Sequence, residues 1–227
     1  MSAEELLSVL LKDRLFYSGE LEYGSWNITS AKLLKKLPGG ITFSGGEPLL
    51  QIFELEPVIH HLHEKGIHLA VESCLYVNPE QLKKAVDLID LFYVDVKILE
   101  PRFSQSILNG EVSVFKRNLE MLMKSRKPIV IRIPVIGQYT DGEENQKLVC
   151  ELLKEYHQKT IEGNAVLLKA ELIQEHNLGE EKYRSLSAVD NSYCLPAYYG
   201  VTDDEMDLYK KRINALVPGL EVEINKV

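Results

Sequence analysis

The chain has 227 residues, of which 45% are hydrophobic, and its formal net charge at pH 7 is −8. A chain of this length and composition can bury one sizeable core, so intrinsic disorder is excluded and one globular domain over residues 1–227 is expected. The acidic balance argues against a broad nucleic-acid interface, which requires a basic face. The sequence shows no signal segment and no run of about 18 apolar residues, so we expect a cytoplasmic protein that does not enter a membrane.

Helical segments and short strands rich in Val, Ile and Leu alternate along the chain. The predicted helices cover residues 2–15, 31–36, 49–65, 78–87, 112–126, 140–157, 180–186 and 202–216. The predicted strands cover residues 41–44, 67–71, 91–96, 129–135, 165–170 and 220–224. This alternation predicts an α/β fold with a parallel sheet covered by helices. Residues 17–30 are aromatic and polar without a clear period, and we expect a loop insertion there.

The cysteines are Cys74, Cys150 and Cys194, and no CxxC or CxxxCxxC spacing occurs. An iron–sulfur cluster is normally held by several thiolates of the protein. Scattered thiols in a reducing compartment are most often plain buried residues. We therefore expect this chain not to ligate a cluster.

The most distinctive stretch is residues 39–51, which read GGITFSGGEPLLQ. A short buried strand runs into a glycine turn, and a helix follows. Gly45 and Gly46 have no side chains, so the backbone N–H and C=O groups there can approach a ligand closely. Pro48 lacks an N–H and suits the first turn of the helix, and Glu47 stands at the mouth of the turn. A pair of glycines alone indicates only a turn, whereas the whole string is far more specific.

This string resembles the GGE motif region of radical S-adenosylmethionine (SAM) enzymes, specifically the activating enzymes of glycyl-radical enzymes such as pyruvate formate-lyase. The resemblance covers about residues 2–224 and implies an incomplete (β/α) barrel. It implies that Gly45, Gly46 and Glu47 hold the amino group of SAM. The family carries a CxxxCxxC loop for a [4Fe–4S] cluster upstream of this motif, and this sequence has none. We therefore expect a barrel of the radical SAM type in which the first strand and the cluster loop are missing.

Further strand ends match the family. Ser73 follows Glu72 where the family has Asp/Glu-Thr. Two residues later, Leu75 stands where a glycine is common in the family. We expect Leu75 to change the turn and to narrow the space for SAM. Asp95 begins the family's Asp-hydrophobic-Lys pattern, which ends at Lys97. The other two matches are Arg132, in IRIPVI, and His176, in a segment that resembles PYHxLGxxKY but lacks the Pro-Tyr.

These residue types suit the chemical groups of SAM. Carboxylates can bind its cationic and hydroxyl groups, and the carboxylates that we expect to do so are Glu47, Glu72 and Asp95. Cationic side chains can bind its carboxylate, and those that we expect to do so are Lys97 and Arg132. His176 is expected to stack on the adenine or to donate to the ribose. The resemblance also implies a monovalent cation, for which hard oxygen ligands are the right type, near Glu72, Ser73 and Asp95.

Structural explanations remain open for several of these residues. Asp95 and Lys97 can form an internal ion pair, Arg132 can be a paired arginine at the edge of the core, and His176 can be a plain loop residue. A further candidate for metal binding is the group His60, His61 and His63 on one predicted helix. No third ligand accompanies residues that share a face there, so a solvated helix face is the better interpretation.

Three functions remain possible. The first is the core of an activating enzyme that binds SAM and, in its complete form, generates a glycyl radical on a partner enzyme; the core alone would be inactive. The second is a natural homologue without a cluster that binds SAM or a partner enzyme and performs no radical chemistry. The third is an α/β scaffold for a different small ligand. The open side of the barrel is also expected to expose strand edges, which favours dimer formation.

Overall fold

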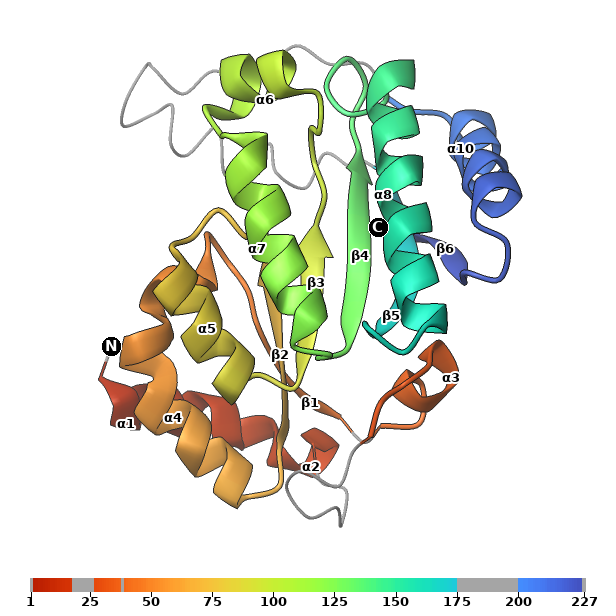
Figure 1. Ribbon diagram of the computed structural model, residues 1–227. Coiled ribbons are helices and arrows are strands. Elements are labelled where there is room, and N and C mark those ends of the chain that lie inside the picture. Colours follow the sequence, from red (N-terminus) through yellow and green to blue (C-terminus); the bar gives the residue numbers. More distant parts are fainter. Residues whose placement is uncertain (1, 18–26, 38, 175–199, 226–227) are drawn as a thin grey trace.

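The computed structural model describes residues 2–17, 27–37, 39–174 and 200–225. In these ranges six strands form one sheet, and their order in space, β1 to β6, is their order in the chain (Figure 1). The strands are β1 (Gly40–Phe43), β2 (His68–Ser73), β3 (Leu91–Asp95), β4 (Ile129–Val135), β5 (Leu167–Gln174) and β6 (Val222–Asn225). Every neighbouring pair is parallel, so all carboxyl ends lie at one edge of the sheet. No pairing joins β1 to β6 in the described ranges, and the open sheet is the incomplete barrel that the sequence predicts.

Helices connect the strands and cover the outer face of the sheet (Figure 1). The segments before β1 are α1 (Ala3–Leu10), the 3₁₀ helix η1 (Leu11–Asp13), α2 (Arg14–Tyr17) and α3 (Ala31–Leu34). The later helices are η2 (Pro48–Gln51), α4 (Ile52–Glu64), α5 (Pro79–Leu88), α6 (Pro101–Leu108), α7 (Val112–Lys124), α8 (Glu143–Ile161) and α10 (Asp203–Leu216). No described helix is both long enough and apolar enough to cross a lipid bilayer.

Side chains alternate between the two faces of each strand, and each face has its own core. On the outer face, residues such as Leu69, Phe92 and Ile131 pack against the helices. The smaller cluster on the inner face consists of Ile28, Ala70, Leu91, Val130 and Leu168. Leu34 and Leu37 pack against this second cluster, so the segment 27–37 covers part of the inner face.

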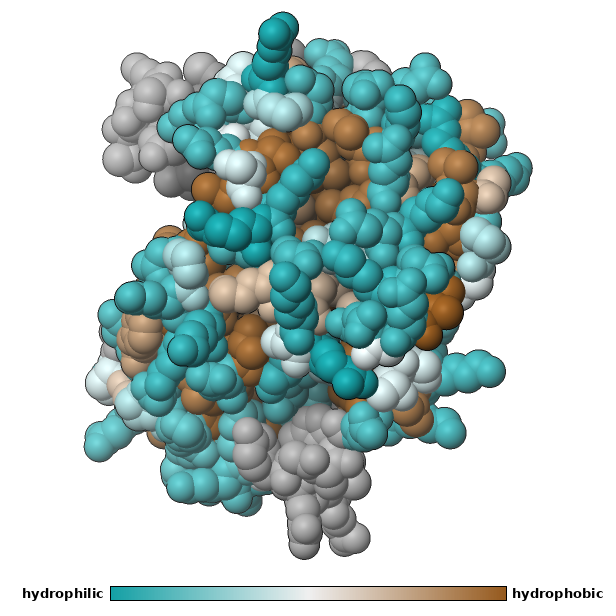
Figure 2. Space-filling model, viewed as in Figure 1, coloured by the Kyte–Doolittle hydropathy of each residue, from teal (hydrophilic) through white to brown (hydrophobic). Residues whose placement is uncertain are grey.

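The outer surface of the helical layer is mostly hydrophilic, as Figure 2 shows. Hydrophobic atoms are visible mainly in the furrow between α7 and α8, over strands β3 and β4. The helices thus turn an apolar stripe toward the sheet and a charged face toward solvent, which is the usual arrangement in a globular α/β protein.

Capping boxes fix the starts of three helices, at the positions where the sequence predicts these helices to begin. Ser2, Asn78 and Thr202 each accept a hydrogen bond from the backbone N–H three residues later, and the side chain of that residue accepts one in return. Each box satisfies two backbone N–H groups that a helix start would otherwise leave unpaired.

The structure differs from the sequence prediction at three elements. Helix α6 was not predicted. It begins at Pro101, and the carboxylate of Glu100 caps it by accepting hydrogen bonds from the backbone N–H groups of Arg102 and Phe103. The predicted start of α8 at residue 140 is wrong, because the helix begins at Glu143 and Gly142 is its N-cap. Thr140 instead donates to the carbonyl of Pro134. Strand β5 extends to Gln174. Helix 180–186 and most of the insertion 17–30 lie outside the described residues.

Candidate functional site

The glycine turn after β1 presents bare backbone at the carboxyl edge of the sheet. Gly45 has a φ of +127°, a conformation that glycine tolerates and other residues rarely adopt. A Cβ atom built at Gly45 or at Gly46 would meet no other atom of the described residues within 4 Å. The turn therefore faces open space, and its N–H and C=O groups are accessible to a ligand.

The Glu47 carboxylate links this turn to the end of β2. One oxygen accepts the backbone N–H of Leu49, at 3.2 Å, and so caps η2. The other accepts the Ser73 hydroxyl at 3.0 Å, the Cys74 backbone N–H at 2.9 Å and the Cys74 thiol at 3.1 Å. The carboxylate is thus engaged by protein donors, and it fixes the position of the turn.

Leu75 has a backbone conformation that glycine adopts readily and other residues rarely. Its φ is +57°, and its N–H donates to the Ser73 hydroxyl oxygen at 2.9 Å. The side chain is fully buried in the outer core. The expectation that Leu75 narrows the site is therefore wrong, because its side chain lies in the core and not at the edge of the sheet.

Arg132 joins two of the predicted carboxylates on the inner face. Its guanidinium donates to Glu72 at 2.5 Å and to Asp95 at 2.9 Å, and it lies 5.9 Å from the centre of the Tyr93 ring. Burial alone would lower the pKa of Arg132, but the facing carboxylates of Asp95 and Glu72 outweigh it and raise the pKa. The position expected for a monovalent cation thus holds a guanidinium. No group of three or more metal-binding side chains occurs in the described part of the chain.

Lys97 lies two residues beyond Asp95, where the chain leaves β3. No ion pair of its ammonium is found among the described residues, and the alternative pair with Asp95 is not formed because Asp95 pairs with Arg132. Its side chain lines a cavity of about 260 Å³, together with Cys74, Tyr76, Leu108, Asn109 and Gly110. Lys97 can therefore offer its charge to an anionic ligand at this edge.

Two buried asparagines, which the sequence analysis missed, hold the loops that carry these groups. Asn118 of α7 donates to the carbonyls of Leu75 and Val77, both at 2.8 Å. Asn145 of α8 donates to the carbonyls of Lys97 and Thr140, both at 3.0 Å. Both asparagines interrupt the apolar stripe of an amphipathic helix, and that signal was available in the sequence.

The described cysteines do not form a cluster site. Cys150 is buried in α8, and Cys74 donates its thiol to Glu47 at the end of β2. Burial raises the pKa of both thiols, which favours the protonated form over a metal-binding thiolate. The third cysteine, Cys194, and the predicted site residue His176 lie outside the described residues.

A second charged group lies on the inner face, at β5 and β6. The ammonium of Lys169 pairs with Glu171 at 2.6 Å and also with Glu223. Lys35, just after α3, pairs with Glu221 and Glu223, both at 2.9 Å. The hydrogen bonds from Lys169 and Lys35 lower the pKa of Glu223 to about 2. These pairs connect the segment 27–37 to the last strand of the sheet.

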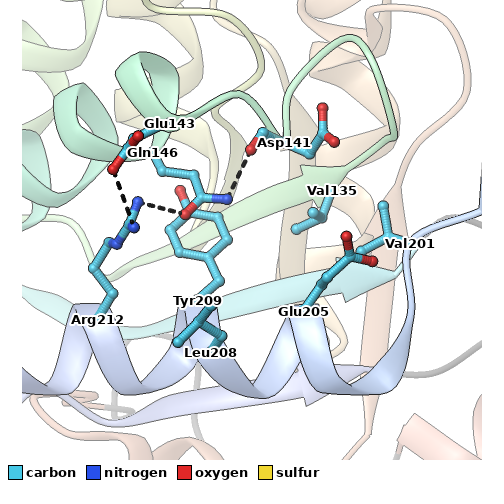
Figure 3. Close-up of a pocket in the computed structure, with 9 residues that line it drawn as sticks. All are labelled: Val135, Asp141, Glu143, Gln146, Val201, Glu205, Leu208, Tyr209 and Arg212. Atoms are coloured by element: carbon cyan, nitrogen blue, oxygen red, sulfur yellow. Dashed lines mark hydrogen bonds and ion pairs between the residues drawn. The ribbon is translucent and has the colours of Figure 1, made fainter.

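A separate pocket of about 270 Å³ lies between α8 and α10, beside the end of β4 (Figure 3). Its charged groups serve the packing of the two helices. Arg212 pairs with Glu143 at 3.5 Å and donates to Gln146 at 2.9 Å. Glu205 accepts from Thr202 in the capping box of α10. We therefore place the candidate site at the glycine turn and not in this pocket.

The chain belongs to the radical SAM superfamily, because the model of that family matches residues 29–149, more than half of its length. The site residues Gly45, Gly46, Glu47, Asp95 and Arg132 all fall inside the matched range.

Several proteins of similar sequence are activating enzymes. The indoleacetate decarboxylase activating enzyme of Tractidigestivibacter scatoligenes is 28% identical over 215 residues, which are 90% of this chain and 62% of that protein. The choline trimethylamine-lyase activating enzyme of Oleidesulfovibrio alaskensis is 28% identical over 80% of this chain and 52% of its own length. The 4-hydroxyphenylacetate decarboxylase activating enzyme of Clostridioides difficile is 31% identical over 65% of this chain and 45% of its own. The chain thus spans about half of the length of the relatives it matches.

Solved structures confirm the fold. A domain of the pyruvate-formate lyase-activating enzyme from Bacteroides vulgatus superposes with a TM-score of 0.62 at 22% identity, over 82% of this chain and 99% of that domain. A radical SAM methyltransferase from Sphaerobacter thermophilus superposes with a TM-score of 0.60 at 11% identity, over 100% of this chain and 58% of the methyltransferase. These likenesses establish the partial barrel.

Proposed function

We propose that this chain binds SAM at the carboxyl edge of the sheet, as part of an activating enzyme for a glycyl-radical enzyme. The observation that carries the proposal is the glycine turn at residues 45 and 46, whose backbone faces open space beside a charged strand edge. The family membership and the activating enzymes among the relatives support the same assignment.

The residues of this edge fit the chemical groups of SAM. The amino group of SAM would meet the carbonyl groups of the turn, because the Glu47 carboxylate is already engaged by Leu49, Ser73 and Cys74. Lys97 would attract its carboxylate, and Arg132 would do so through the guanidinium N–H groups that its hydrogen bonds to Glu72 and Asp95 do not use. The monovalent cation at Glu72, Ser73 and Asp95 remains a prediction, and it would require the Arg132 guanidinium to give way.

The contribution of this chain is to bind and orient SAM. In the family, SAM and a reduced [4Fe–4S] cluster together supply the radical chemistry that removes a hydrogen atom from a glycine of the partner enzyme. The described cysteines do not fit such a cluster, because Cys150 lies in the core and the Cys74 thiol is bound to Glu47. We therefore assign no step of the reaction to a cluster ligand of this chain.

The second candidate function is SAM or partner binding without radical chemistry, and the poor fit of the described cysteines favours it. The two candidates differ in one result. If a segment with the CxxxCxxC loop of a relative is joined in front of Met1 and reconstituted, the core of an activating enzyme will cleave SAM. A homologue that only binds SAM will not cleave it under any reconstitution.

Titration of SAM into the purified chain tests the binding itself. Arg132→Ala and Lys97→Ala each remove a charge-assisted contact, so each should weaken SAM binding by about 1.5–3 kcal/mol, roughly 10- to 100-fold. Glu47→Gln should also weaken binding, because it disturbs the anchor of the turn. His60→Ala is the matched control, since His60 lies on the exposed face of α4. Equal affinity in all four variants and the parent chain would contradict the site.

A further inference from the structure

Asn118 is a polar residue in an apolar stripe. On α7 the neighbours on the buried face are Phe115, Leu119 and Leu122, which pack on the outer face of the sheet. The Asn118 side chain is 1% exposed. A buried polar group is unfavourable unless hydrogen bonds compensate for its lost hydration, so its partners indicate what it does.

The amide of Asn118 is used only through its NH₂ group. It donates to the carbonyls of Leu75 and Val77, both at 2.8 Å. Its own carbonyl oxygen has no hydrogen-bond partner among the described residues. Two facing carbonyls require the NH₂ side of the amide, so the orientation of the side chain is fixed. A buried asparagine with one unsatisfied oxygen is poorly explained by packing alone.

The main chain that Asn118 holds is strained. Leu75 has a φ of +57°, in the left-handed region that residues other than glycine adopt at a cost. Hydrogen bonds hold this residue from both sides. Its carbonyl accepts from Asn118, and its N–H donates to the Ser73 hydroxyl oxygen at 2.9 Å.

From Leu75 the chain of hydrogen bonds continues to the glycine turn. The Ser73 hydroxyl that accepts from Leu75 donates to Glu47 at 3.0 Å, and the Cys74 N–H donates to the same carboxylate oxygen at 2.9 Å. The second oxygen of Glu47 caps the helix that begins at Pro48. A continuous path thus connects α7, on the outer face, with the turn at the carboxyl edge.

We infer that Asn118 is a positioning residue for the glycine turn: it holds Leu75 in the left-handed conformation and thereby directs Ser73 and Cys74 onto Glu47. Asn118 acts through these groups and touches no ligand. The inference rests on the proposed function only where it concerns SAM. The effect on the turn itself can be measured without any ligand.

Two substitutions of Asn118 test the inference against a matched control. Asn118→Ala removes the amide, and Asn118→Leu also removes it but continues the apolar stripe at similar size, so that folding is retained. Leu119→Ala is the control on the same helix, because Leu119 is fully buried and takes no part in the path. All variants should have a lower unfolding midpoint.

The decisive readout is amide hydrogen exchange at Cys74 and Leu75 in the absence of SAM. Both Asn118 variants should exchange these two amides at least about tenfold faster than the parent, at conditions where the proteins remain folded, because the local opening becomes easier. Leu119→Ala should leave the exchange of these two amides within about twofold of the parent. Equal acceleration in Leu119→Ala, or none in the Asn118 variants, overturns the inference.

The second readout is SAM affinity, combined with Ser73→Ala. If Asn118 acts through Ser73, the loss of affinity in the double variant Asn118→Ala/Ser73→Ala is smaller than the product of the two single losses. Losses that multiply fully would show independent effects and overturn the path. If the parent chain does not bind SAM at all, the proposed function fails, whereas the exchange measurement still decides whether Asn118 fixes the turn.

Discussion

At the scale of single residues, Leu75 sets two effects against each other. Its left-handed backbone conformation favours glycine by about 1–2 kcal/mol. Its fully buried side chain stabilises the fold by a larger amount, since removal of a core leucine costs about 2–5 kcal/mol. The buried side chain therefore outweighs the backbone strain, and leucine is the more stable residue at this position.

This balance predicts an unusual order of stability. Leu75→Gly should be destabilised by a few kcal/mol relative to the parent chain, because the core contacts are lost. Leu75→Ala should be less stable than Leu75→Gly by about 1 kcal/mol, because alanine loses the same contacts and keeps the strain. Urea unfolding of the three proteins measures the order. An alanine variant more stable than the glycine variant would contradict the role of the backbone conformation.

His68 makes stability depend on pH. Burial lowers the pKa of His68, and the facing Asp90 offsets only part of this effect. The folded protein thus favours the neutral ring, and the unfolded chain binds a proton more readily. The contribution of His68 to the free energy of unfolding is fully present above the pKa of histidine in the unfolded chain, about 6.5, and is lost as the pH falls below that value.

A titration of stability tests this prediction. The free energy of unfolding should fall between pH 7 and pH 5 in the parent chain, and His68→Gln should flatten this part of the profile. His61→Gln is the control, because it removes an exposed histidine by the same substitution. Identical slopes in the parent chain and His68→Gln would show that other groups carry the pH dependence.

At the scale of elements, the charged group at Lys35 and Glu223 connects the segment before β1 to β6. The carboxylate of Glu223 is partly exposed, so salt should screen its attraction to Lys35 and Lys169. Its pKa of about 2 means that its contribution is present above the ordinary carboxyl range and is lost only as the pH falls toward 2.

Glu223→Gln should therefore lower the unfolding midpoint at neutral pH and low salt, and the difference from the parent should shrink as salt is added. Glu64→Gln is the control, because the Glu64 side chain is 76% exposed and its ion pair with His61 is long, at 3.9 Å. Thermal unfolding at two salt concentrations measures both differences. A loss in Glu223→Gln that does not respond to salt would indicate that packing, and not charge, holds the segment.

Elements with a local signal could be predicted from the sequence, and those that depend on distant contacts could not. Asn78 and Thr202 mark helix starts because the capping box is complete within four residues. The start of α8 could not be predicted in this way, because the Thr140 hydroxyl forms its hydrogen bonds with the Pro134 carbonyl and the Ile136 N–H instead of with the helix.

The residues of the candidate site likewise fall into those that the sequence predicts and those whose partners depend on distant contacts. Gly45 and Gly46 are visible in the sequence because the backbone conformation of the turn requires glycine. The engagement of Arg132 by Glu72 and Asp95 depends on the register of three strands, which residue types alone do not supply. Asn118 could have been found as the polar exception in an apolar stripe, but its target at Leu75 could not.

At the scale of the whole molecule, β1 and β6 are the edge strands of the sheet that the described residues form, and exposed edges favour association. Leu15 and Phe16 of α2, beside β1, are 81% and 77% exposed. We expect the chain to dimerise through this side, with a sedimentation coefficient that rises with concentration. Replacing both residues by serine should shift the equilibrium toward the monomer. A strictly monomeric parent chain would contradict this expectation.

The central claim is that SAM binds against the bare backbone of the glycine turn, and Gly46→Ala tests it most directly. The added methyl group meets no atom of the described part of the chain within 4 Å, and Gly46 has no positive φ that would strain alanine, so the unfolding midpoint should not change. Calorimetric titration should show one SAM bound per parent chain and binding at least about tenfold weaker in Gly46→Ala. Equal affinity in the two proteins, or no binding by the parent, would contradict the account.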